Sequence, residues 1–189
     1  MTLVVDSVHC VEQSDESGSD DVYLIGFIGR TVPPLATALG TRGPGALWSN
    51  FDTGEKEGTD VDTGLFTAAD ALYAVMLVEE DAAKDISGDQ VLGEWKFQTN
   101  AAWKATMLAR VAGGLPTNSA AGRSEGFIAI KDTLNGLAAL YMELPFGDDD
   151  VLNTKRVTIN QPGQSQVIRF RSDAEDATYD VFFKHKANA

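Results

Sequence analysis

The sequence predicts a mainly β protein, an antiparallel β-sandwich that carries an inserted helical hairpin. Two observations predict this class. Apolar segments rich in Val, Ile, Tyr and Phe, bounded by Ser, Gly and Asp clusters, occur toward both ends of the chain, as is typical of strands. Between them, residues 89–142 carry apolar side chains at three- and four-residue spacing, which is typical of helices. Because strands and helices do not alternate along the chain, this architecture fits better than an α/β sheet.

The length suits one domain. A chain of 189 residues is long enough to bury a sizeable core, and two full domains would be cramped. With 43% hydrophobic residues, the composition is that of a folded protein. We therefore expect a single domain over residues 1–189, with residues 89–142 as a helical insertion within it.

Strands and loops are expected in the first part of the chain. Residues 2–11 and 22–28 have strand composition, and we expect them to pair with each other across the acidic segment that joins them. From residue 30 to residue 64, repeated Pro and Gly predict long surface loops around a short segment at ALWSNF. The stretch ALYAVMLVEED, residues 71–81, predicts a buried strand that continues directly into acidic residues.

A first helix is expected to follow that strand. Ser87 or Asp89 is its candidate N-cap, and Gly113-Gly114 is its candidate end. Large aromatic side chains within it, Trp95 and Trp103, are expected to anchor the helix to the strands.

A second helix and three strands complete the expected fold. Residues 113–126 form a Gly-, Ser- and Ala-rich connection, after which apolar residues from Phe127 to Tyr141 repeat at helical spacing. Strand composition then returns, with polar turns between the segments. These strands are expected at residues 154–159, 165–171 and 177–185.

The net charge excludes one class of partner. The formal charge is −13, with 15 basic residues scattered among 28 acidic ones, whereas nucleic-acid binding relies on clustered Lys and Arg. Cations or basic proteins are better candidates. The start of the chain predicts neither a classical signal peptide nor a transmembrane segment, so we expect a protein that is cytoplasmic or exported without a classical leader.

Acidic residues gather at three places, each at the end of an expected strand. Carboxylates this close repel one another, and a divalent cation would neutralise them. Ca²⁺ accepts oxygen ligands in irregular loop geometry, whereas Mg²⁺ is stricter and less favoured. Solvated turns are the alternative explanation, because Asp and Ser are ordinary turn residues. The clusters are Asp15, Glu16, Asp20 and Asp21; Glu79, Glu80, Asp81, Asp85 and Asp89; and Asp148, Asp149 and Asp150.

Zinc and histidine-based catalysis find little support in the sequence. Only His9, His185 and Cys10 offer nitrogen or sulfur ligands, and they show no zinc-site spacing. Cys10 is expected to be a small buried strand residue. With two histidines, a Ser-His-Asp arrangement is poorly supplied, so we expect no enzyme.

The first acidic segment resembles a known type of calcium loop. SDESGSDDVYLIGF resembles the first calcium loop of C2 domains, with Asp15, Asp20 or Asp21, and Tyr23 at the matching positions. VMLVEEDAAKDISGDQVLGEW resembles a later C2 loop, in which an apolar strand ends at acidic residues. GDDDVLNTKRVTI repeats part of that pattern, and the opening is also similar to a set of bacterial C2-like modules.

The resemblance implies a β-sandwich that binds Ca²⁺ at one end through its loops. The acidic loops supply the ligands in this hypothesis, and the candidates are Asp15, Asp20, Asp21, Asp81, Asp85, Asp89 and Asp149. The corresponding function is a non-catalytic structural or interaction module that self-associates as a homo-oligomer. Two alternatives stay open: a calcium-dependent membrane-binding or toxin-like effector, and a carbohydrate-active enzyme. The helical hairpin is expected to pack on the sandwich, to contact another subunit or, least favoured, to enter a membrane surface.

Overall fold

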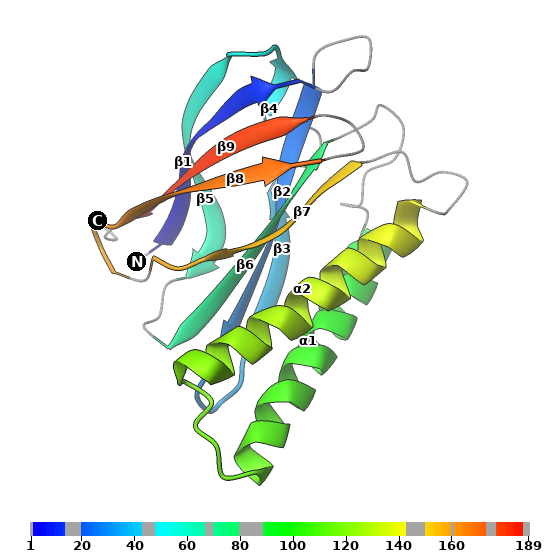
Figure 1. Cartoon of the computed structure of the whole chain (residues 1–189), viewed down its shortest axis with the longest axis vertical. Coiled ribbons are helices and arrows are strands. Elements are labelled where there is room, and N and C mark those ends of the chain that lie inside the picture. The colour runs from blue at the N-terminus through cyan, green and yellow to red at the C-terminus, as the bar shows by residue number, and fades with distance from the viewer. Residues whose placement is uncertain are drawn as a thin grey trace.

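The protein is mainly β, and its described residues form two antiparallel sheets and two helices (Figure 1). The computed structural model describes residues 2–13, 20–42, 48–66, 70–79, 89–142, 150–159, 161–172 and 177–186. The elements in chain order are β1 (Thr2–Glu12), β2 (Asp20–Arg30), β3 (Thr37–Arg42), β4 (Trp48–Phe51), β5 (Lys56–Phe66), β6 (Ala71–Glu79), α1 (Asp89–Ala112), α2 (Ala120–Met142), β7 (Asp150–Val157), β8 (Ser165–Arg171) and β9 (Thr178–Lys186).

Non-neighbouring parts of the chain build both sheets. One sheet has the strand order β5-β1-β9-β8. The other has the order β3-β2-β6-β7, and β4 adds to it by pairing with the start of β2. The first and last strands of the chain therefore lie side by side, antiparallel, inside the four-stranded sheet.

One apolar cluster draws on both sheets. Its members include Leu3 and Val5 of β1, Leu24 of β2, and Phe170 and Phe183 of β8 and β9. Side chains alternate between the two faces of a strand, so each of these strands contributes every second residue to the cluster wherever its register is regular. Cys10 is a buried member of the same cluster, as its strand context predicts.

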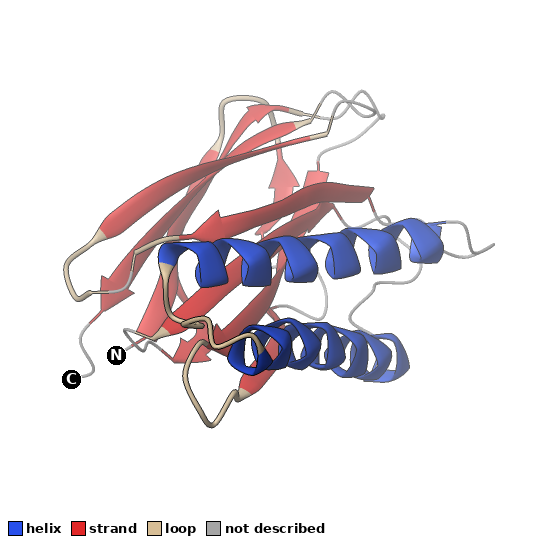
Figure 2. Ribbon diagram, turned by 60° about the horizontal axis from the view of Figure 1, so that its bottom comes forward, coloured by secondary structure: helices blue, strands red, loops and turns tan. Residues whose placement is uncertain are grey.

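The second apolar cluster lies between the five-stranded sheet and the helices. Both helices lie along one face of this sheet (Figures 1 and 2). Strand β6 contributes alternate residues to each cluster, and all nine of its residues are buried. Burial on both faces explains why this strand is apolar from Ala71 to Val78 and why its sequence alone predicts it well.

A slot between two glycines holds Trp103 at the centre of the second cluster. A methyl group on Gly29 of β2 would lie 2.6 Å from the indole Cε2, and one on Gly126 of α2 would lie 2.6 Å from Cζ3. The indole Nε1 donates a hydrogen bond to the carbonyl of Arg30 at 3.2 Å, and its ring contacts Phe27 at a centroid distance of 5.8 Å. Trp103 therefore joins α1, α2 and β2, as its predicted anchoring role requires.

Short-range signals set the turn between the helices. Gly114 has a φ of 69° and donates to the carbonyl of Val111, while Leu115 donates to the carbonyl of Arg110. This is the pattern of a glycine-terminated helix, and it confirms the predicted end at Gly113-Gly114. The hydroxyl of Ser119 accepts from the amide of Gly122 at 3.1 Å and caps the start of α2.

The expected pairing of the first two strands is wrong. β1 pairs with β5 and β9, whereas β2 pairs with β3, β4 and β6. One apolar face of β1 and one of β2 meet within the same cluster from opposite sheets. Burying both apolar faces this way removes them from water, which side-by-side pairing by itself does not do.

Two other expectations are corrected as well. Residues 30–64 contain β3 and most of β5 where long surface loops were expected, and β4 lies on the expected short segment ALWSNF. The second helix begins at Ala120, so half of the expected connection over residues 113–126 is helical.

Candidate functional site

Strand register brings three strand ends together at one end of the five-stranded sheet. Val22, near the start of β2, is the partner of Glu79 at the end of β6. Glu79 is in turn the partner of Asp150 at the start of β7. Paired residues in antiparallel strands have Cα atoms about 5 Å apart. Asp20 and Asp21 begin β2, so acidic residues of three strands lie at this one end of the sheet.

Each of these strand ends continues into one of the acidic segments. β2 follows residues 14–19, β6 precedes residues 80–88, and β7 follows residues 143–149. The strand ends that adjoin the three segments are therefore neighbours on one sheet.

The predicted ligands are only partly within the described structure. Asp15, Asp81, Asp85 and Asp149 lie outside the described residues. Asp20 and Asp21 begin β2, and Asp89 is the first residue of α1. Asp21 is half-buried, whereas the side chains of Asp20 and Asp89 are outside the described part.

The predicted ligand set did not include two acidic residues at this end, Asp150 and Glu79. Glu79 is the buried one. It is 5% exposed and follows Leu77 on the face of β6 that points toward the four-stranded sheet. An ionised carboxylate is costly to bury unless positive charge or hydrogen-bond donors compensate it. The sequence itself indicates that Glu79 lies on this face. Tyr73, Val75, Leu77 and Glu79 are every second residue of the strand, and such residues point to the same face.

Nitrogen and sulfur ligands do not assemble in this fold. Leu3 is the strand partner of His185, and Cys10 is the partner of Tyr179, so His185 and Cys10 lie toward opposite ends of β1. Seven residues of strand separate these two positions, or about 23 Å. Across the described ranges, no group of three or more His, Cys, Asp or Glu stands close enough to hold a metal ion.

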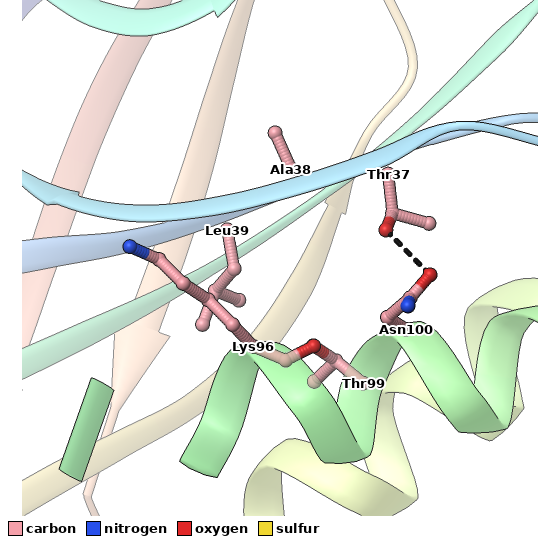
Figure 3. A pocket seen from close by; sticks show the side chains of 6 residues that line it. All are labelled: Thr37, Ala38, Leu39, Lys96, Thr99 and Asn100. Carbon is pink, nitrogen blue, oxygen red and sulfur yellow. Dashed lines mark hydrogen bonds between the residues drawn. The ribbon is translucent and has the colours of Figure 1, made fainter. Parts of the chain in front are cut away.

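A polar hollow of about 410 Å³ lies between β3 and α1 (Figure 3). Most of its polar side chains already have hydrogen-bond partners within the protein. The hydroxyl of Thr37 donates to Asn100 Oδ1 at 2.9 Å, and the hydroxyl of Thr99 donates to the carbonyl of Trp95 at 2.7 Å. Among the described residues that line it, Lys96 is the one charged residue. These described residues include no pair of groups for acid–base chemistry.

An apolar hollow of about 320 Å³ opens between the two helices, close to the acidic end. Trp95, Leu137, Leu140 and Tyr141 are among its lining residues. Leu140 is 63% exposed. Of the helices in the described structure, neither is long and apolar enough to span a membrane.

Comparison with known proteins adds no assignment. No protein-family model, curated protein or solved structure matches this chain.

Proposed function

We propose that the chain is a non-catalytic, C2-like calcium-binding module, and that the Ca²⁺ site lies where β2, β6 and β7 end together. One observation carries the proposal: the register that makes Val22, Glu79 and Asp150 neighbours across three strands. In this proposal the two sheets form a C2-like sandwich, and loop oxygens surround the ion. Hard divalent cations prefer such carboxylate and carbonyl ligands, and Ca²⁺ tolerates irregular geometry better than Mg²⁺ does.

The proposed role is structural, with another copy of the chain as the partner. Support comes from a row of apolar side chains on the outer side of α1, where Phe97 is 65% exposed and Leu108 and Val111 are more than half exposed. These three residues are eleven and three positions apart, spacings that place them on the same side of a helix. Light scattering of the protein with and without Ca²⁺ measures whether copies associate through this surface.

A calcium-dependent membrane-binding module is the second candidate. The apolar hollow beside the acidic end, with exposed Leu140 at its edge, favours this alternative. Co-sedimentation with vesicles that depends on Ca²⁺ separates it from the structural role.

Thermal melting of chelator-stripped protein tests the calcium site. A ligand that binds only the folded state raises the melting temperature by mass action. We expect Ca²⁺ in millimolar excess to raise it and Mg²⁺ to raise it less. Asp20→Asn combined with Glu79→Gln should abolish the rise, because it removes two carboxylates at the strand ends.

A matched variant serves as the control. Glu57→Gln makes the same type of change at an exposed position on β5, in the other sheet, and should keep the full calcium response. Equal melting temperatures with and without Ca²⁺ in the unaltered chain would exclude the proposed site.

A further inference from the structure

Cationic side chains gather on the helix-covered face of the five-stranded sheet, away from its acidic end. Arg156 of β7 is the strand partner of Ala74 of β6. Ala74 belongs to the apolar cluster beneath the helices, and direct strand partners share a face, so Arg156 projects from the helix side. A second contact agrees: Thr154, two residues earlier, donates to Oδ1 of Asn135 on α2 at 2.7 Å.

Arg123, near the start of α2, reaches the same region. Its Nη1 donates to the carbonyl of Ala71 on β6 at 3.0 Å. Ala71 and Ala74 are about 10 Å apart along the strand, a span that two arginine side chains cover between them. Burial lowers the pKa of Arg156, and the charge of Arg123 lowers it further, so the two guanidinium groups act on each other.

Lys131 adds a third positive charge to this groove. On α2 it stands four residues after Phe127, which packs against the apolar cluster, and four residues before Asn135, which bonds to β7. Residues four apart lie on one side of a helix, so half-buried Lys131 faces β7 as well.

Two of these three cations, Arg156 and Lys131, lack a carboxylate partner in the described structure. Among described residues, neither the Arg156 guanidinium nor the Lys131 amine has a hydrogen-bond or ion-pair partner. Asp70, which adjoins Ala71, is bound by Arg30 through Nε at 3.0 Å and Nη2 at 2.6 Å. A half-buried, unpaired cation is costly, and a second cation beside it raises the cost. In a chain of net charge −13, this arrangement points to a missing anion.

We propose that the groove between α2 and β7 binds a phosphate group, with Arg156 as the main ligand and Arg123 and Lys131 beside it. The planar guanidinium donates two parallel hydrogen bonds that match phosphate oxygens. A doubly charged phosphate balances several cations better than a single carboxylate does. This site goes beyond the calcium proposal and does not depend on it.

Inorganic phosphate is the probe for a first test, with chelator present so that the proposed calcium site is empty. Melting temperatures are recorded against phosphate at constant ionic strength, with acetate in a parallel series. We expect a saturable rise with phosphate and a smaller one with acetate. Arg156→Gln should weaken the apparent affinity about tenfold or more, because it removes charge-assisted hydrogen bonds. Lys131→Gln provides a second variant and should weaken it less.

The control is Arg171→Gln, which removes an exposed arginine from β8 in the other sheet and should leave the phosphate response unchanged. Glycerol 3-phosphate and vesicles with and without phosphatidic acid then distinguish a small phosphate ester from a lipid headgroup. Binding of either that is lost in Arg156→Gln supports the site. A phosphate response that is absent, or that Arg156→Gln and Lys131→Gln retain in full, would overturn it.

Discussion

Glycine at two positions decides how closely Trp103 packs. Neither Gly29 nor Gly126 needs the special backbone freedom of glycine, since neither has a positive φ. Each is instead a place where a methyl group would overlap the indole. Tight interiors yield little to such an insertion, so the absence of a Cβ is the property that matters here.

A pair of alanine substitutions on α2 tests this packing. Gly126→Ala places a Cβ 2.6 Å from the indole and 2.8 Å from Met107, and we expect it to destabilise the fold by about 1–3 kcal/mol. Gly136→Ala meets nothing within 4 Å and should stabilise the same helix by about 0.5–1 kcal/mol. Urea unfolding measures both. Equal effects of the two substitutions would show that Trp103 does not fill a rigid slot.

His185 is a buried titratable group at the opposite end of β9 from the acidic strand ends. It is 4% exposed, and its ring lies edge-on to Tyr73 at a centroid distance of 6.4 Å. Neither ring nitrogen makes a well-formed hydrogen bond within the described part of the chain. Burial lowers the pKa of His185, and the backbone of Ile159 offsets part of that change. The folded protein therefore favours the neutral imidazole.

This burial predicts a loss of stability in mild acid. The unfolded chain has the higher histidine pKa, about 6.5, and so binds the proton first as the pH falls. The stabilisation that comes from neutral His185 is therefore complete above about pH 6.5. Below that pH the free energy of unfolding falls, with a slope of at most about 1.4 kcal/mol per pH unit. We expect His185→Phe to flatten this slope in melts between about pH 7.5 and pH 5.5. A slope in His185→Phe equal to that of the unaltered chain would contradict the assignment.

At the scale of elements, strong patterns predicted the structure and weak ones did not. β6 and α1 were predicted because each carries a long, regular apolar pattern. β3 and β5 were missed because each lies at the edge of its sheet and carries Gly, Thr and charged residues. Edge strands bury less surface, so their sequences need fewer apolar residues.

The start of α2 was missed for a different reason. Gly122 and Gly126 have the composition of a flexible connection, yet both are glycine because neighbouring atoms leave no room for a Cβ. The spacing of these two glycines nevertheless indicates a helix. They extend backward, at four-residue intervals, the buried series of Ile130, Leu134 and Ala138.

At the scale of the whole molecule, the two proposed sites lie toward opposite ends of one sheet. In the antiparallel pairing of β2, β6 and β7, the start of β2 lies beside the end of β6, which lies beside the start of β7. Asp20, Asp21, Glu79 and Asp150 therefore lie at one end of the sheet. Toward the other end, β6 begins beside Arg123, and Arg156 lies near the end of β7. Acidic side chains thus lie at one end of these strands, and arginine side chains lie toward the other end.

Local sequence patterns predicted the acidic clusters, whereas only the resemblance to C2 domains implied that they lie at one end. Each cluster was visible next to a strand end, yet local patterns do not say which strands are neighbours. The mistaken pairing of the first two strands illustrates the limit, since both have the same composition and only the packing of the whole chain assigns them to different sheets. Glu79 and Asp150 were seen as members of clusters, and only the register identifies them as partners.

The most direct test of the calcium site is a ¹H–¹⁵N NMR titration of chelator-stripped protein with Ca²⁺, in a buffer without phosphate. We expect saturable shifts in the amide signals of Val22, Glu79 and Val151, where the strand ends meet. The signals of Arg30 and Ala71, at the other end of the same strands, should stay in place. An unchanged spectrum, or shifts confined to that other end, would contradict a calcium site between the acidic strand ends.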